Sequence, residues 1–333
     1  MRPSTLHSLT QSLGKFEMKS IINQLVIICC CITVIASCQS AAESPTNTVS
    51  TTKDRTDTKL YPAIPAKSLR KALAAAKGGK YVAPSSAEVR EAEALFIRTL
   101  QGEQSQDLQN AWQAQGFMLG TLTQNGTTFT VVQEVNEKRT GRGFYLFRQK
   151  GGLPVALQAP HSYKDLYTRK IARKLMREGN YVAAGWNTVP RYGRNKYKEF
   201  ADMAHLDDTI FQAFGRAFAK QYPTGTIAQL HGFAQGYRKT VVGKTADLIF
   251  SGTTKRPSQR VLETGDCLKS QLTDFVVRIY PNEIGELGGT TNSNAKDLRA
   301  RGFNNFFHVE MSKALRARLR KDKQVRGQLS ACL

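Results

Sequence analysis

Three of the five histidines lie where an apolar run ends or a turn begins. His231 closes an apolar run that starts at Thr226, His161 directly follows a second run, and His308 lies inside a third. Open α/β folds bind ligands at the carboxyl edge of their sheet, where the strands end. If these runs are strands, the imidazoles are placed where a ligand would meet them.

A carboxylate lies close in sequence to two of these imidazoles. Asp165 is four residues after His161, and Glu310 is two residues after His308. Neutral imidazoles and a carboxylate, with one position left for water, are the usual surroundings of a catalytic zinc ion. The pattern therefore predicts a metal-dependent hydrolase.

Each of these residues also has an ordinary structural interpretation. A histidine that is hydrogen-bonded in a protein core would give the same pattern at His161 or His231. Glu310 could instead pair with Lys313 or Arg316 at the start of the next helix. Both interpretations stay open at the level of sequence.

The elements that must position these residues follow from the periodicity of apolar side chains. Strands are expected at residues 117–122, 127–133, 143–147, 155–159, 181–185, 226–230, 246–250, 275–279 and 306–311. Helices are expected at residues 87–99, 105–115, 166–178, 209–221, 258–272 and 312–323. Strands and helices alternate in the second half, so we predict an α/β domain with a mixed, mainly parallel sheet covered by helices. Asn125-Gly126 suits a type I′ turn and predicts a β-hairpin added at the N-terminal side.

Residues 1–37 have the pattern of an export signal. A basic start at Met18 precedes an apolar run over residues 25–35, which is shorter than the about 20 residues that span a membrane. Because this pattern is complete from Met18, residues 1–17 are interpreted as an upstream extension.

The signal ends in Ile-Ala-Ser before Cys38, which resembles the bacterial lipoprotein processing box. Cleavage there would leave Cys38 as a lipidated N-terminus and anchor the protein to a membrane of the cell envelope. Gln39 is not the aspartate associated with inner-membrane retention, so the outer membrane is favoured. An ordinary secretory signal or an uncleaved anchor is the alternative.

The mature chain is predicted to have two parts. Residues 38–84 are rich in Ser, Thr, Ala and Lys and are interpreted as a lipidated tether. Residues 85–333 have the length of one α/β domain. Cys267 and Cys332 remain in this domain, and in an oxidising compartment they are expected to form a disulfide, with two unpaired buried cysteines as the alternative.

The formal net charge is +22, spread over several basic clusters in the domain. Such a charge attracts polyanions and raises their rate of encounter. We find no nucleic-acid-binding motif, so an anionic peptide, polymer or lipid headgroup is expected rather than nucleic acid.

The order of five short motifs resembles the N-formylglutamate amidohydrolase and phage poly-γ-glutamate hydrolase group. The resemblance covers residues 153 to 318 and implies the zinc carboxypeptidase fold. The motifs are residues 159–165, 204–209, 229–233, 287–294 and 308–312.

The resemblance also implies roles for single residues. His161 and His231 match the two zinc-binding histidines of the group, and Glu310 matches its catalytic base. Asp165 approximates the acidic zinc ligand, although the group usually has Glu there at a slightly different spacing.

Further residues are candidates for the substrate cleft. His205 lies in a block that borders the cleft in this group, and it is assigned to substrate or oxyanion binding. His308 shares a sheet face with Glu310 and could orient it or contact substrate. Asn292 and Asn294 could hold a substrate carboxylate or carbonyl, or could simply form a turn. Three arginines are candidates for the cationic contact to a substrate carboxylate: Arg191, Arg194 and Arg299.

Together these features predict an envelope-anchored, zinc-dependent hydrolase that cleaves an amide bond in a glutamate-containing or γ-glutamyl substrate. One alternative is a basic lipoprotein without catalytic activity that binds an anionic polymer or lipid. A second is a metal-dependent phosphoesterase, for which the sequence lacks the expected carboxylate-rich, two-metal cluster.

Overall fold

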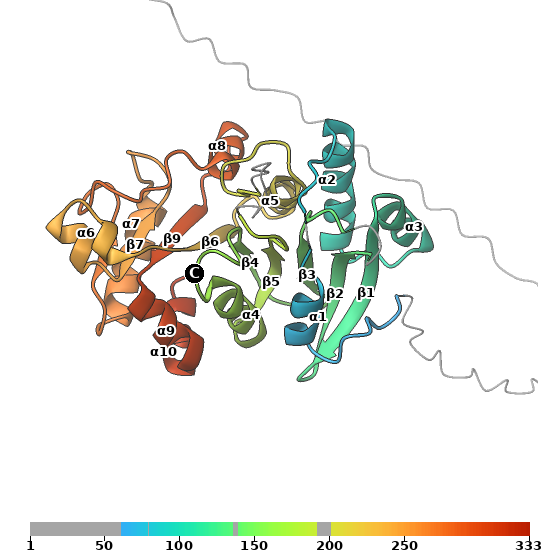
Figure 1. Ribbon diagram of the computed structural model, residues 1–333, viewed down its shortest axis with the longest axis horizontal. Helices are drawn as coiled ribbons and strands as arrows, with labels where there is room; N and C mark the ends of the chain where they lie inside the picture. The colour runs from blue at the N-terminus through green and yellow to red at the C-terminus, as the bar shows by residue number, and fades with distance from the viewer. Residues whose placement is uncertain (1–60, 79, 136–138, 192–200) are drawn as a thin grey trace, which may run out of the picture. The chain divides into compact units, whose positions relative to one another are not determined.

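Nine strands form one mixed sheet in the computed structural model, which describes residues 61–78, 80–135, 139–191 and 201–333 (Figure 1). The order across the sheet is β1-β2-β3-β5-β4-β6-β9-β7-β8. The strands are β1 (Phe117–Gln124), β2 (Thr127–Glu134), β3 (Phe144–Arg148), β4 (Leu153–Ala159), β5 (Tyr181–Trp186), β6 (Thr226–Gly232), β7 (Leu248–Ser251), β8 (Val277–Ile279) and β9 (Phe306–Met311). The predicted export signal, Cys38 and Arg194 lie outside the described residues.

The mixed sheet is confirmed, and its parallel part is its centre. The neighbours β5-β4, β4-β6 and β6-β9 are parallel, as is the pair β7-β8. The other four pairs are antiparallel, including the predicted hairpin of β1 and β2. Asn125 and Gly126 have φ angles of 51° and 75°, as a type I′ turn requires. Four of the described sheet's eight strand pairs are therefore parallel, a smaller share than predicted.

Helices cover both faces of the sheet (Figure 1). They are α1 (Leu69–Ala75), α2 (Ser86–Leu100), α3 (Gln106–Ala114), α4 (Thr168–Glu178), α5 (Ile210–Gln221), α6 (Val241–Thr245), α7 (Gln259–Gln271), α8 (Ser293–Ala300), α9 (Lys313–Lys321) and α10 (Lys323–Ser330). Ser or Thr caps the N-termini of most of them, as in α2, where Ser85 and Glu88 form a capping box. None of the helices in the described part of the chain is long and apolar enough to cross a membrane.

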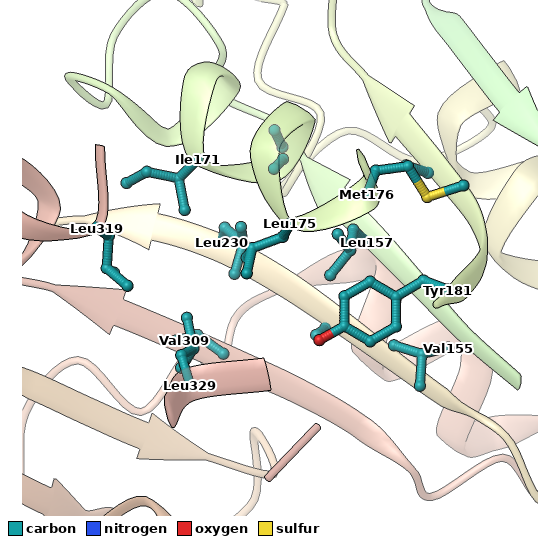
Figure 2. Close-up of a cluster of buried hydrophobic side chains, with 14 of the residues drawn as sticks. Val155, Leu157, Ile171, Leu175, Met176, Tyr181, Leu230, Val309, Leu319 and Leu329 are labelled. Atoms are coloured by element: carbon teal, nitrogen blue, oxygen red, sulfur yellow. The ribbon is translucent and has the colours of Figure 1, made fainter. Parts of the chain in front are cut away.

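The two faces of the sheet bury different kinds of apolar side chain. Under α4, α9 and α10 the core is mainly aliphatic, with Leu175 and Leu319 packed over Leu230 and Val309 (Figure 2). Under α2 and α5 the core is aromatic and includes Phe96, Trp112, Tyr145, Phe147 and Phe214. Packing on both faces holds the central strands rigidly, and their ends carry the candidate site.

The domain starts before the expected boundary at residue 85. Tyr61, Leu69 and Leu73 are buried, and the Tyr61 hydroxyl donates a hydrogen bond of 2.9 Å to the Glu103 carbonyl. A few well-spaced apolar residues in a polar segment are enough to pack it against the sheet. The described residues between 61 and 84 thus belong to the domain and not to a tether.

The predicted disulfide is confirmed. Cys267 of α7 is bonded to Cys332 just after α10, with their Cα atoms 5.7 Å apart. The bond ties the chain end to α7.

Candidate metal centre

The predicted site residues meet at one edge of the sheet. His161 follows β4, His231 lies near the end of β6, and Glu310 lies near the end of β9. In the parallel register of β6 and β9, His231 is paired with Glu310. The three strands run in the same direction, so their carboxyl ends carry these side chains to the same place.

Two histidines and a carboxylate converge there. Potential ligand atoms of His161, Asp165 and His231 all lie within 4.8 Å of one another. Asp165 Oδ2 lies 3.2 Å from Nδ1 of His161 and 3.6 Å from Nδ1 of His231. A tight turn returns Asp165 to His161, because the Asp165 amide donates to the His161 carbonyl at 3.0 Å. All three side chains are buried.

The opposite nitrogen of each imidazole is held by an acceptor. Nε2 of His161 lies 2.8 Å from Oδ1 of Asp202, and Nε2 of His231 lies 2.7 Å from Oε1 of Gln229. A carboxylate or amide oxygen can only accept, so each neutral ring carries its proton on Nε2. In a neutral ring the Nδ1 lone pair then points toward the Asp165 carboxylate, whereas a protonated ring donates a hydrogen bond to it from Nδ1.

This arrangement fits a metal ion. Two lone pairs and a carboxylate oxygen that face one another in a buried space repel unless a cation or protons lie between them. Histidines that bind metals typically donate their other N–H to a carboxylate or amide oxygen, as both do here. Two nitrogens and one oxygen, with no thiolate, form the usual protein set of a catalytic zinc site.

The pKa shifts agree with a site prepared for a cation. Burial raises the pKa of Asp165, but hydrogen bonds with His161 and His231 outweigh it and hold that pKa well below its usual range. Burial lowers the pKa of His231 to about 4, so its ring is neutral at pH 7. For His161, burial lowers the pKa, but the hydrogen bonds with Asp165 and Asp202 outweigh it and raise the pKa.

Asp202 is a site residue that the sequence did not reveal. Besides His161, it contacts Nδ1 of His205 at 3.1 Å and forms an ion pair with Arg191. Burial raises its pKa, but the hydrogen bonds from both histidines hold that pKa well below its usual range. Asp202 lies two residues before the block 204–209 and three before His205. This closeness of a carboxylate to a candidate histidine is the sequence signal that could have identified Asp202.

Glu310 and His308 lie beside this group. Their potential ligand atoms and those of His231 lie within 4.8 Å of one another, and His308 Nε2 lies 3.9 Å from Glu310 Oε1. Oε2 of Glu310 is buried without a hydrogen-bond partner among the residues that the structure describes. Burial raises the pKa of Glu310 to about 8, and the charge of Asp165 adds to the effect. A carboxyl group with such a pKa can accept and return a proton near neutral pH.

His308 is buried against the ring of His231, with the ring centroids 4.3 Å apart. Its Nδ1 is buried without a partner in the described part of the chain, and burial holds its pKa well below the usual value. Gly289 has a φ of +63°, and a Cβ there would lie 2.8 Å from the His308 ring. The loop after β8 thus depends on glycine to approach His308.

The alternative for Glu310, an ion pair with Lys313 or Arg316 of the next helix, is not found among the described residues. Arg316 donates instead to the carbonyls of Phe233 and Ser312, at 3.1 and 3.3 Å. The Arg316 guanidinium packs directly against the backbone of Gly232, so a Cβ at position 232 would collide with it. Arg316 is a buried cation beside the site, and its side-chain path could not be read from sequence spacing.

The residues expected at the substrate cleft separate into two groups. His205 is on the surface, and its Nε2 lies 3.2 Å from Oγ1 of Thr291. Asn292 caps α8 and donates to Gln229, while Asn294 donates to the Met203 carbonyl at 2.6 Å. Both asparagines are buried and their side-chain nitrogens donate within the protein, while Oδ1 of Asn294 has no hydrogen-bond partner among the described residues.

A cavity of about 410 Å³ lies beside His205 and Thr291. Its wall carries both signs of charge. The cations are Arg216, Lys296 and Arg301, the carboxylates are Asp207, Asp208 and Asp297, and Asp297 pairs with both arginines. Of the predicted carboxylate-binding arginines, Arg191 pairs with Asp202 and Arg299 donates to Thr253 at 3.0 Å. The cations that line the cavity in the described part of the chain are therefore not Arg191 or Arg299, the described candidates from the sequence.

Comparisons with known proteins found similarity to solved structures at low sequence identity. Neither a scan of protein-family models nor a search of curated proteins found a match. One similar solved structure is the N-formylglutamate amidohydrolase from Ralstonia eutropha JMP134, at 10% identity and a TM-score of 0.37, over 58% of this chain and 95% of that one. Another is a metallo-carboxypeptidase from Burkholderia cenocepacia, at 11% identity and a TM-score of 0.37, over 65% of this chain and 76% of that one. These similarities concern the fold; the function proposed below rests on the side chains.

Proposed function

We propose that this domain is a zinc-dependent hydrolase that cleaves an amide bond in an acidic, glutamate-containing or γ-glutamyl substrate at the cell envelope. One observation carries the proposal. The Nδ1 atoms of His161 and His231 face Oδ2 of Asp165, while their Nε2 atoms are held by Asp202 and Gln229.

A zinc ion bound by His161, His231 and Asp165 would polarise an amide carbonyl and lower the pKa of water. Asp202 and Gln229 keep each ring in the tautomer that leaves Nδ1 free. Glu310 takes a proton from the attacking water and passes it to the departing nitrogen, as the carbon–oxygen bond forms and the carbon–nitrogen bond breaks. Its raised pKa suits both transfers.

Positive charge supports an acidic substrate. The chain carries a net charge of +22, and Lys296 lines the cavity next to His205, where Arg301 is paired with Asp297. Such cations raise the local concentration of an anionic chain and would contact its side-chain carboxylates. His205 on the rim lies where a bound chain would pass.

The envelope location rests on Cys38 and on the disulfide. The disulfide between Cys267 and Cys332 is typical of a protein that matures in an oxidising compartment. Lipid on Cys38 would add the anchor, preferentially in the outer membrane. Replacing Cys38 by Ser is expected to abolish both processing before residue 38 and sedimentation with membranes. A variant that is still processed and still pellets contradicts the anchor.

Metal content is the first test of the proposed hydrolase. Purified wild-type protein is expected to contain about one zinc per chain, and His161→Ala or His231→Ala should lose it because the ligands must converge. His205→Ala, which removes an imidazole from the surface, is the matched control and should keep its zinc. Elemental analysis that finds equal zinc in all four proteins contradicts the site.

Activity is the second test. A panel of peptides, N-acyl amino acids, γ-glutamyl chains and phosphoesters, assayed with zinc, separates the reaction classes. We expect turnover of the γ-glutamyl or glutamate-containing members. Turnover of phosphoesters alone, or binding of anionic polymers by a metal-free protein without turnover, favours one of the two alternatives.

A further inference from the structure

Exposed apolar side chains gather near the site in the segment between β6 and β7, residues 235–245, which we term the tip. It contains the 3₁₀ turn Gln235–Tyr237 and helix α6. Tyr237 and Val241 are 83% and 77% exposed, and Val242 is 38% exposed. Large apolar groups that stand together in water usually mark a surface that contacts something else.

The tip belongs to the same edge of the sheet as the candidate metal centre. It leaves the carboxyl end of β6, just after His231, and enters β7, whose first residue Leu248 is paired with Met311 at the end of β9. Figure 1 shows α6 at the end of the domain that holds β7. Val276, also exposed, lies next to it, because the Asp247 amide donates to the Val276 carbonyl at 2.8 Å.

The tip is braced in this conformation. Glu286 accepts hydrogen bonds from the amides of Lys239 and Thr240 at 3.3 and 3.2 Å and from the Thr240 hydroxyl at 2.7 Å. Gln235 donates to the Ala246 carbonyl at 2.9 Å. The turn therefore holds its apolar side chains outward and does not let them fold back onto the domain.

Positive charge surrounds these apolar groups. Lys239 and Lys244 are exposed on the tip. Two nearby carboxylates are already bonded: Glu286 accepts from the turn and lies 3.6 Å from Arg238, and Asp247 accepts from the Ser312 hydroxyl and the Val276 amide. The outer surface of the tip thus combines an aromatic ring and two valines with two lysines.

We propose that the tip docks on an anionic phospholipid surface, with Tyr237, Val241 and Val242 entering the headgroup region. A stable protein interface needs about 800 Å² from each partner, which is more than these few side chains offer. A bilayer accepts single side chains, favours tyrosine at its interface, and gains about 1 kcal/mol for each lysine near anionic lipid. This docking does not depend on the proposed hydrolase activity, and it would turn the site edge toward the membrane.

A tryptophan reporter tests the docking. The two native tryptophans, Trp112 and Trp186, are fully buried, so Tyr237→Trp adds one exposed fluorophore to the full chain. Its emission should shift to the blue with phosphatidylglycerol vesicles and be quenched by brominated phosphatidylglycerol. Zwitterionic vesicles should have little effect. Adding Lys239→Gln and Lys244→Gln should raise the half-saturating lipid concentration roughly 30-fold, at about fivefold for each lysine.

Leu153→Trp is the matched control. Leu153 is 51% exposed at the start of β4, on the opposite edge of the sheet, so it reports any vesicle contact made by another part of the chain. Its emission should not change. An unchanged spectrum of the Tyr237→Trp protein, an equal response at both positions, or a response that the lysine substitutions do not weaken overturns the proposal. A shift with γ-glutamyl polymer in the absence of lipid would assign the tip to substrate binding and also overturn it.

Discussion

The aromatic cluster under α2 and α5 and the histidine–carboxylate group at the strand ends are both buried, but they are built by opposite rules. In the cluster, Phe96 packs edge-on against Trp112 at 4.8 Å and Tyr145 at 4.7 Å. The polar atoms of these rings are satisfied, because Trp112 Nε1 donates to the Thr99 hydroxyl at 3.1 Å and the Tyr145 hydroxyl donates to the Arg142 carbonyl at 2.7 Å.

The group at the strand ends leaves polar atoms unpaired. Oε2 of Glu310 and Nδ1 of His308 are buried without partners among the described residues. Each such atom costs about 1–3 kcal/mol of stability. The aromatic cluster therefore stabilises the fold. The unpaired polar atoms of the site lower its stability, and the same atoms are the ones proposed to take part in catalysis. Substitutions in the two regions should have opposite consequences.

The largest expected effect is on turnover. Glu310→Gln should lower amide hydrolysis about 10² to 10⁴-fold, because glutamine cannot accept the proton. Zinc content should not change, and the thermal midpoint should not fall, since the substitution removes a carboxyl that burial disfavours when charged. Steady-state kinetics, elemental analysis and calorimetry on one preparation measure all three.

Near-normal turnover of Glu310→Gln would show that another residue is the base. Loss of zinc together with activity would make Glu310 a ligand. Either result breaks the division of roles between Glu310 and the three proposed ligands.

The converse substitution lies in the aromatic cluster. Phe214 is fully buried and packs against Phe96, Tyr145 and Phe147. Phe214→Ala should lower the free energy of unfolding by about 3–5 kcal/mol through the cavity it leaves. The folded fraction should keep its zinc and its turnover per molecule. Denaturant unfolding tests this, with Phe214→Leu as the conservative control, and a loss of zinc from the folded fraction would mean that the two regions are coupled.

A smaller effect is expected at Asp202, which holds His161 without facing the proposed metal. Asp202→Asn should weaken zinc binding about 10 to 100-fold, as is typical when the partner of a metal-binding histidine is lost. Competition with a chelator measures the affinity. Asp207→Asn, the same change at an exposed position nearby, should leave zinc binding unchanged. Equal affinities in the two variants would remove Asp202 from the site.

The smallest expected effect is at the start of α2, the helix that carries Phe96. Ser85→Ala removes the capping box and should cost about 1 kcal/mol, with turnover unchanged. Hydrogen bonds from the Ser85 amide, from Arg142 and from the Ser85 hydroxyl lower the pKa of Glu88 from its ordinary value of 4.5, and Ser85→Ala removes the bond from the hydroxyl. The contribution of Glu88 is therefore complete above that value and is lost as the pH falls through the lowered pKa. Thermal unfolding at pH 7 and at pH 3 should show a smaller difference between variant and wild type at the lower pH.

Elements with a strong local pattern could be predicted from sequence. The nine strands were found because short apolar runs are separated by polar or turn residues, and Asn125-Gly126 specified the hairpin. The tether was extended too far, because the few apolar residues from Tyr61 to Leu73 have no period that distinguishes a packed segment from a linker.

Residue types and their positions at strand ends were sufficient to select His161, Asp165, His231 and Glu310. The type of a side chain and its place in a strand both depend on the nearby sequence alone. The partners that give these side chains their roles depended on the fold. Asp202, Gln229 and the path of Arg316 reach the site across loops and neighbouring strands, and the same long-range packing engaged Asn292 and Asn294 inside the protein. Hydrogen bonds and burial are set by distances in space, which sequence spacing does not contain.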